Sequence, residues 1–215
     1  MNLPDEIQAV ISTFPRTHDL AADVDVVFKA FGREITRQHV PRATRLAGKL
    51  AIRFGVDVRA VRTAMLLHDI GGIFRRDDMV RLCEALNLPV EQEERHVPML
   101  LHAKLSVVLA REWQGVTSPD ILQAIRYHTT LHAGATALDQ VVFLADKLEW
   151  DQDGRPPYFA DLSAALDAGL EAGTRWMLRW LAFPEANLLI PHPDLREAWR
   201  KYHIRAVPAH NLTKF

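Results

Sequence analysis

Apolar residues recur every three or four positions along most of the chain. The segment 39–55 shows the pattern clearly, and its apolar positions are Val40, Ala43, Leu46, Ala47, Leu50 and Phe54. This spacing places all of them on one face of an α-helix, and Gly55 follows as a common helix stop. Asp57 can cap a second helix that runs to Leu67. The pattern therefore predicts amphipathic helices that each bury one face.

Helical spacing continues to the end of the chain. Ser118 with Pro119, and Thr136 with Asp139, are typical of helix starts. The further helices that we expect cover residues 78–86, 97–114, 118–128, 136–150, 161–183 and 193–204. No segment of alternating β-branched residues competes with them, and no repeat or linker divides the chain. The sequence therefore predicts an all-α fold in a single domain, residues 1–215.

Composition narrows the class of protein. The 26 Lys and Arg residues nearly balance the 27 Asp and Glu residues, and the sequence pI is about 6.8. This balance gives no broad electrostatic footprint for nucleic acid or for an anionic membrane. No apolar run approaches the roughly 20 residues of a membrane span, and the first residues lack a signal-peptide layout. The single cysteine, Cys83, is expected to be a buried thiol. We expect a cytoplasmic protein.

Ten histidines direct attention to metal binding. Four of them and two aspartates lie beside apolar residues in or next to the predicted helices: His39, His68, Asp69, His102, His128 and Asp146. One such histidine alone is usually a hydrogen-bonded core residue. Six inward-facing groups need partners, because an unpaired buried charge is costly. A metal centre would supply them, and mixed imidazole and carboxylate ligands suit iron, manganese or zinc. The number of ligands favours two metal ions, with Asp69 as the bridge.

The order of these residues resembles a known family. His39, then His68-Asp69, then Asp146 form the H…HD…D signature of HD-domain metal-dependent phosphohydrolases. The segments "LLHDIGG", "LLHAKLSVVLARE", "AIRYHTT" and "VVFLADKLE" resemble the bacterial HD hydrolases that split diadenosine tetraphosphate symmetrically. The resemblance covers residues 35–150. It implies an HD-domain helical bundle as the metal-binding core, with residues 151–215 as a C-terminal helical extension.

The resemblance also implies a ligand assignment. The first metal would be held by His39, His68, Asp69 and Asp146, and the second by Asp69, His102 and His128. Members of this family use iron, so iron is the implied metal, with manganese or zinc as alternatives. Two such ions activate water and clamp phosphoryl oxygens, and no serine or cysteine nucleophile motif appears in the sequence.

The sequence departs from the family pattern in four places. Gly72 stands where relatives usually have lysine, and Ala103 and Leu131 stand where glycine is common. The family's "ADYIEP" is here "ADKLEW", which introduces Lys147 and Trp150. These positions could contact the substrate. Because Gly72 removes a cation, we expect Lys147 or Lys104 to replace its charge in part.

For other polar residues the sequence gives weaker indications of a role in the site. Besides Asp69, the residues expected to take part in catalysis are Lys104, Arg126 and Lys147; Arg75 and Arg76 are more typical of surface charges. Thr129 and Thr130 suit either a phosphate contact or a plain turn. His96 and His132 could replace a metal ligand if the helix register differs. The residues expected at the surface are His18, His192, His203 and His210, and those expected in the core are Trp176, Trp180 and Trp199.

The sequence favours one function and leaves two others open. The first is a di-metal phosphohydrolase that acts on a nucleotide or dinucleoside polyphosphate, with diadenosine tetraphosphate and two ADP as best substrate and products. The second is a single-metal nucleotide phosphatase on the same fold. The third is a non-catalytic nucleotide-binding regulator. The sequence does not decide whether the chain forms a homodimer.

Overall fold

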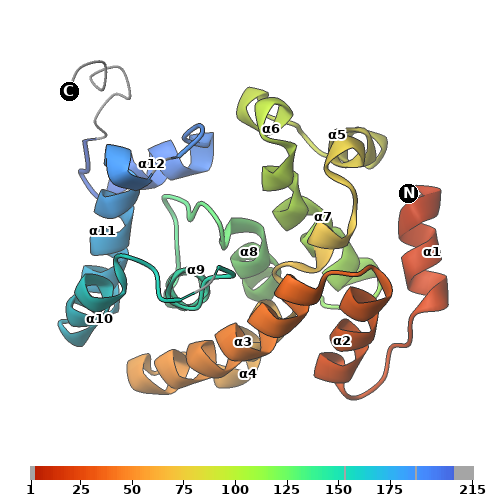
Figure 1. The fold of residues 1–215 in the computed structure, drawn as a ribbon, viewed down its shortest axis with the longest axis horizontal. Coiled ribbons are helices and arrows are strands. Elements are labelled where there is room, and N and C mark those ends of the chain that lie inside the picture. Colours follow the sequence, from red (N-terminus) through yellow and green to blue (C-terminus); the bar gives the residue numbers. More distant parts are fainter. Residues whose placement is uncertain (1–2, 153, 187, 206–215) are drawn as a thin grey trace.

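The structure is a computed structural model that describes residues 3–152, 154–186 and 188–205. Over these residues the chain forms twelve α-helices and three short 3₁₀ helices and no β-strand, which confirms the all-α prediction. Figure 1 shows α1 and α2 at one end of the molecule, α10, α11 and α12 at the other, and α8 and α9 between them.

Five helices form the central bundle. They are α3 (Glu34–Phe54), α4 (Val58–Leu67), α7 (His102–Glu112), α8 (Pro119–Tyr127) and α9 (Ala137–Leu148). α3 packs against α4 and α9, while α8 packs against α4, α7 and α9. Ala47 of α3, Val61 of α4 and Val141 of α9 are fully buried between these helices. Burying one such valine side chain stabilises the bundle by roughly 1.5–3 kcal/mol.

Short elements at the N-terminal side cover one end of the bundle. They are α1 (Asp5–Thr13), α2 (Leu20–Ala30), η1 (Ile70–Ile73), α5 (Arg76–Ala85), α6 (Gln92–His96) and η2 (Pro98–Leu101). α2 packs on α3 and α4, and η1 packs closely against α7. The predicted helix 97–114 is therefore two elements, a 3₁₀ turn that Pro98 begins and then α7. Cys83 is buried, and burial raises the pKa of its thiol to about 12.

The C-terminal side contains α10 (Phe159–Asp167), α11 (Leu170–Leu181), η3 (Pro184–Ala186) and α12 (Pro193–Lys201). The prediction of one long helix over 161–183 is wrong. Gly169 has a φ of 138°, which a helix cannot contain, and the chain turns there. α10 and α11 then pack against each other, and α11 also packs on α9. The three tryptophans expected in the core, Trp176, Trp180 and Trp199, all pack against it.

The N-terminal part of α3 also differs from its prediction. The helix begins at Glu34 and continues through Pro41, so His39 lies within it instead of at its start. Pro41 has no N–H to donate, and the helix tolerates the loss of that hydrogen bond. Gly55 ends the helix as predicted, with a φ of 66°.

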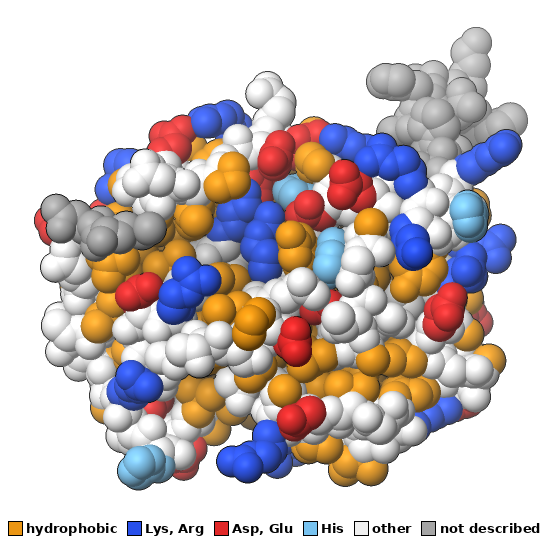
Figure 2. Space-filling view, turned by 180° about the vertical axis from the view of Figure 1, so that it is seen from behind, with side chains coloured by type: hydrophobic (Ala, Val, Ile, Leu, Met, Phe, Trp, Pro, Cys, Tyr) orange, Lys and Arg blue, Asp and Glu red, His pale blue; other side chains and the backbone are white. Residues whose placement is uncertain are grey.

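The molecular surface mixes both signs of charge. Figure 2 shows basic and acidic side chains interspersed over the face seen from behind. The apolar side chains beneath form one contiguous cluster that extends from Ile7 to Tyr202. Among the described residues, no helix combines the length and apolar character that a bilayer crossing requires.

Candidate metal centre

Side chains from five segments of the central bundle converge on one point. They are His39, His68, Asp69, His102, His128 and Asp146. His68 and His128 directly follow the last residues of α4 and α8, and His102 is the first residue of α7. Asp146 lies in the last turn of α9. Because these helices end at the same place, their terminal side chains reach one centre from different directions.

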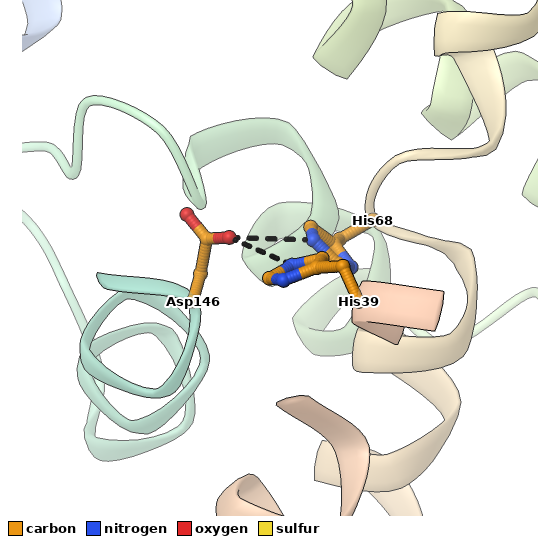
Figure 3. Close-up of side chains that lie close together, drawn as sticks. All are labelled: His39, His68 and Asp146. Carbon is orange, nitrogen blue, oxygen red and sulfur yellow. Dashed lines mark ion pairs between the residues drawn. The ribbon is translucent and has the colours of Figure 1, made fainter. Parts of the chain in front are cut away.

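The first group consists of His39, His68 and Asp146. Figure 3 shows the Asp146 carboxylate facing the two imidazole rings across a short gap. Its Oδ1 lies 3.3 Å from Nε2 of His39 and 3.5 Å from Nε2 of His68. All three ligand atoms lie within 4.8 Å of one another, close enough to share one metal ion. Both histidines are buried, whereas the Asp146 side chain remains 17% exposed and borders a cavity.

The second group is built around Asp69. Its Oδ1 lies 3.2 Å from Nε2 of His102 and 3.5 Å from Nε2 of His128. Its Oδ2 lies 3.2 Å from Nε2 of His68, which belongs to the first group. The two oxygens of one carboxylate therefore face different histidines. This is the geometry that a bridging carboxylate requires.

Backbone carbonyls fix the orientation of three imidazoles. Nδ1 of His68 donates to Met65 O at 2.7 Å, and Nδ1 of His128 donates to Ile125 O at 2.8 Å. In the same way, Nδ1 of His102 donates to Met99 O at 2.5 Å. Each acceptor lies three residues before the histidine. With its proton on Nδ1, a neutral imidazole presents the lone pair of Nε2 to the centre, which is how metal-binding histidines are held.

The electrostatics keep the carboxylates charged. Burial raises the pKa of Asp69 and of Asp146, but neighbouring positive groups outweigh it and hold both well below the usual range. His68 lowers the pKa of both carboxylates, and Lys147 also lowers the pKa of Asp146. Burial lowers the pKa of His68, yet the two carboxylates raise it to about 10. At His128 burial prevails and the pKa falls to about 4. The two carboxylates thus favour a positive charge at Nε2 of His68, where a bound cation would take the place of the proton, while His128 stays neutral.

The donor set fits divalent cations. Among the described residues, Nε2 of His39 and Nε2 of His68 are buried without a hydrogen-bond partner, and such atoms are rare in folded proteins. Nε2 of His102 and Nε2 of His128 face each other at 3.0 Å. Both rings use Nδ1 as the donor, so this contact places the lone pairs of the two Nε2 atoms opposite each other. Their repulsion is relieved only if a positive charge lies beside them. A cation bound by these atoms would remove both defects.

A cavity of about 280 Å³ opens beside the centre. Metal-centre residues line it together with Thr129, Lys147, Trp150, Asp151, Gln152 and Tyr158. Nζ of Lys147 lies 2.7 Å from Oδ2 of Asp146, the oxygen turned away from the histidines. Thr129 Oγ1 lies 3.0 Å from Nε2 of His128. The cavity therefore offers a cation and a hydroxyl beside a cluster of metal-ligand atoms.

Comparison with known proteins identifies the family. A family model of the HD domain matches residues 36–151, more than half of the chain. The chain belongs to the HD domain family. The matched region contains all six converging residues, so the H…HD…D resemblance read from the sequence is confirmed. HD domains bind divalent metals, and the His and Asp groups of this chain could hold them.

Individual members of the family also resemble this chain in sequence. A Lactococcus lactis protein described as an uncharacterized protein in the pepC 5' region is 38% identical over 63% of this chain and 68% of its own length. A Bacillus subtilis protein named symmetrical bis(5'-nucleosyl)-tetraphosphatase is 33% identical over 52% of this chain. That match spans 59% of the Bacillus protein. The chain is thus an HD-domain protein related to proteins of that name.

A solved structure shares the fold. It is described as a predicted HD superfamily hydrolase involved in NAD metabolism from Clostridium acetobutylicum. The TM-score is 0.75, and the alignment covers 84% of this chain and 95% of the other at 21% identity. At that identity the match shows the fold alone, and it extends the likeness beyond the HD core into the C-terminal helices.

The expected phosphate-binding cations do not all reach the HD site. Lys147 lines the cavity, but Lys104 is buried and pairs with Glu94 at 2.6 Å, on the other side of α7. Arg126 lies 3.4 Å from Asp194, away from the cavity lining. Arg75 and Arg76 are exposed, as expected of surface charges. Among the described residues that line the cavity, Lys147 is the only lysine or arginine.

The remaining histidines lie outside the centre. His96 is exposed, and His132 stacks on Tyr127, so neither replaces a metal ligand. His18 and His203 are exposed as predicted, and His210 lies outside the described residues. The expectation that His192 lies at the surface is wrong. Its side chain is 3% exposed, with Nε2 3.3 Å from Glu94 Oε1 and Nδ1 3.2 Å from Asp194 Oδ2.

Two departures from the family pattern prove to be packing positions. Ala103 is buried and does not line the cavity. Leu131 is fully buried and has a φ of 58°, in the left-handed region that glycine adopts most easily. Its N–H donates to Tyr127 O at 2.7 Å and caps the end of α8. The position thus keeps the backbone conformation of glycine while the side chain joins the core. Thr130 is buried next to it, whereas Thr129 faces the cavity.

Sequence reasoning did not single out Tyr158 or Gln152 as cavity residues. They reach the cavity because the segment after α9 folds back across it, with Tyr158 Oη donating to Lys147 O at 3.0 Å. The sequence of this segment predicts only a loop. Its position depends on the packing of α10 and α11, which local sequence does not reveal.

Proposed function

We propose that this chain is a di-metal phosphohydrolase that cleaves a phosphoanhydride bond in a nucleotide. Its best substrate would be diadenosine tetraphosphate, cut symmetrically into two ADP. The observation that carries the proposal is the position of Asp69, whose two oxygens face His68 on one side and His102 with His128 on the other. One carboxylate between two groups of histidines suits two cations better than one.

The proposed ligand sets follow the two groups of side chains. His39, His68, Asp69 and Asp146 would hold one ion, and Asp69, His102 and His128 the other. Two divalent ions so held would act as Lewis acids on phosphoryl oxygens and lower the pKa of a water molecule. Iron is the metal that the family resemblance favours, with manganese or zinc as alternatives that the same ligand types accept.

The other cavity residues position the substrate. The Lys147 ammonium, which pairs with Oδ2 of Asp146, can also donate to a phosphoryl oxygen that enters the cavity. Thr129 Oγ1 offers a further hydrogen bond at the second group of ligands. In the proposed reaction a water oxygen bonds to one of the two central phosphorus atoms. The P–O bond to the central bridging oxygen breaks, and that oxygen leaves with the other ADP. Phosphoryl transfer of this kind depends mainly on positioning and charge neutralisation.

The convergence of six ligands argues against the single-metal phosphatase, because one ion would leave His102 and His128 without a role. The relatives named symmetrical bis(5'-nucleosyl)-tetraphosphatase support the choice of substrate.

The test is a product analysis under anaerobic conditions with reduced iron, and separately with manganese. Diadenosine tetraphosphate, ATP and AMP are each incubated with the protein, and the products are separated by chromatography. We expect ADP as the only product from diadenosine tetraphosphate. Equal amounts of AMP and ATP would contradict symmetrical cleavage. Release of phosphate from AMP alone would favour the phosphatase, and absence of any turnover with metals bound would favour a regulator.

A further inference from the structure

A second cavity adjoins the metal pocket. Its volume is about 470 Å³, and it lies between α3 and the segment that follows α9. Trp150 and Gln152 line both cavities, so they form the wall between them. Trp150 lies four residues after Asp146, just past the end of α9. A molecule with phosphates at the metal centre could therefore extend past Trp150 into this second space.

The walls of the second cavity suit a flat, polar ring system. Leu46, Leu148 and Phe159 make part of its lining apolar. The Trp150 ring is fixed by a hydrogen bond from Nε1 to Gly154 O at 3.0 Å, and it remains partly exposed. Aromatic side chains that are held in place in this way stack on nucleobases of any sequence.

Charged groups at the cavity provide polar contacts. Arg155 lies over the Phe159 ring, 4.7 Å from its centroid. Arg42 Nε pairs with Glu149 Oε1 at 2.5 Å, and both residues line the cavity. This pair is close to neutral overall and can exchange hydrogen bonds with the hydroxyl and amino groups of a nucleoside.

We propose that the second cavity binds one nucleoside of the substrate, with Trp150 as the stacking surface between that nucleoside and the phosphates. The inference rests on the proposed function, since it assigns a place to a nucleoside attached to the phosphates at the metal centre. It also gives Trp150, a departure from the family pattern, a role in choosing nucleotides over inorganic polyphosphates.

The test compares two probes that differ only in the nucleoside. ADP and inorganic pyrophosphate are titrated separately into the metal-loaded protein by calorimetry, for the wild type and for Trp150→Ala, Trp150→Phe and Phe183→Ala. Phe183 is exposed and lines neither cavity, so it is the matched aromatic control. Metal content is measured for each variant, because Trp150 lies near Asp146.

We expect Trp150→Ala to raise the Kd of ADP about tenfold or more, within the range of aromatic stacking on a base, and to leave the Kd of pyrophosphate within twofold. Trp150→Phe should recover most of the ADP affinity, and Phe183→Ala should match the wild type. An unchanged ratio of the two Kd values in Trp150→Ala, or an equal loss for both probes, would overturn the nucleoside site. These binding measurements need no turnover, so their outcome is independent of the product analysis. If no substrate is hydrolysed but ADP binding depends on Trp150, the proposed function fails and the nucleoside site remains.

Discussion

At the residue scale, the metal centre depends on a repeated local arrangement. In three of its histidines the ring donates Nδ1–H to the carbonyl three residues earlier, which leaves Nε2 to face the centre. Two of the acceptors, Met65 O and Ile125 O, lie in the last turns of α4 and α8, where carbonyl groups lack helical partners. The position of a histidine at a helix end therefore sets both its direction and its tautomer.

Lys147 is the residue whose role can be tested most sharply. Lys104 is held in a buried pair with Glu94, so of the two lysines only Lys147 can replace the positive charge that relatives have at the position of Gly72. We predict that Lys147→Ala lowers kcat/KM for diadenosine tetraphosphate about tenfold or more, the value of one charge-assisted contact. Metal content should stay unchanged. Lys49→Ala, an exposed lysine on α3, serves as the control in the same steady-state kinetics.

Gly72 offers a way to restore the charge. A Cβ added at Gly72 would meet no atom within 4 Å, so the backbone there leaves room for a side chain to begin. The double variant Gly72→Lys with Lys147→Ala should therefore recover part of the lost activity. Kinetics in Lys147→Ala equal to those of the wild type would rule out the compensation by Lys147.

At the element scale, the packing of η1 against α7 joins the two parts of the site. Neither of the two glycines in this 3₁₀ turn has a positive φ, so unusual backbone angles do not explain them. Gly71 is needed for a different reason. A Cβ there would lie 2.2 Å from His102 O and 2.6 Å from Ser106 N, both on α7. Gly71 N–H also donates to Ser106 Oγ at 2.8 Å. The turn after Asp69 thus lies directly on the helix that carries His102.

This contact predicts different effects at neighbouring glycines. Gly71→Ala must move α7, so we expect a loss of about 1–3 kcal/mol in the free energy of unfolding, typical of an overpacked core. Metal binding at the His102 and His128 pair should weaken as well. Gly72→Ala is the control and should stay within about 0.5 kcal/mol of the wild type. Urea denaturation measures both. Equal stability of the two variants would contradict the close contact.

The elements also show what the sequence can predict. Periodic apolar residues were enough for α4, α8 and α9, and for α3 from His39 onward, because each buries one continuous face. The break at Gly169 was missed, since apolar spacing continues on both sides of it. The 3₁₀ turn before His102 was missed for a similar reason. In both cases the boundary depends on backbone conformation, which the apolar pattern does not record.

At the scale of the whole molecule, a buried ion network attaches α12 to the bundle. Glu94 of α6 contacts Lys104 of α7 at 2.6 Å and His192, the residue that caps α12, at 3.3 Å. Asp194 faces the other nitrogen of His192 and also lies 3.4 Å from Arg126 of α8. The six metal-centre residues could be chosen from the sequence because their types and neighbours form a known pattern. This network could not, because its members are ordinary charges far apart in the chain.

The network predicts a pH dependence of stability. Burial lowers the pKa of His192, but Asp194 and Glu94 outweigh it and raise it above the ordinary 6.5. Burial raises the pKa of Glu94, yet His192 and Lys104 lower it to about 2. The contribution of His192 is therefore complete below pH 6.5 and is lost as the pH rises through its raised pKa. That of Glu94 is present above its ordinary 4.5 and is lost only as the pH falls toward 2.

We therefore expect His192→Gln to lower the free energy of unfolding by about 1–3 kcal/mol at pH 6, and by progressively less as the pH rises through the raised pKa of His192 and the wild type loses that proton. Chemical denaturation at several pH values measures this difference, with the exposed His18→Gln as the control. A deficit that stays constant from pH 6 to pH 9 would show that the charge of His192 does not stabilise the fold.

The central claim is that Asp69 joins two metal ions in one centre. The most direct measurement is the metal content per chain, by elemental analysis after anaerobic reconstitution, of the wild type, Asp69→Ala and His102→Ala, with the exposed Asp120→Ala as the control. We expect two ions in the wild type and in Asp120→Ala, about one in His102→Ala, and near-complete loss of both ions and of turnover in Asp69→Ala. One ion or fewer in the wild type, or two ions retained in Asp69→Ala, would contradict the two-metal centre.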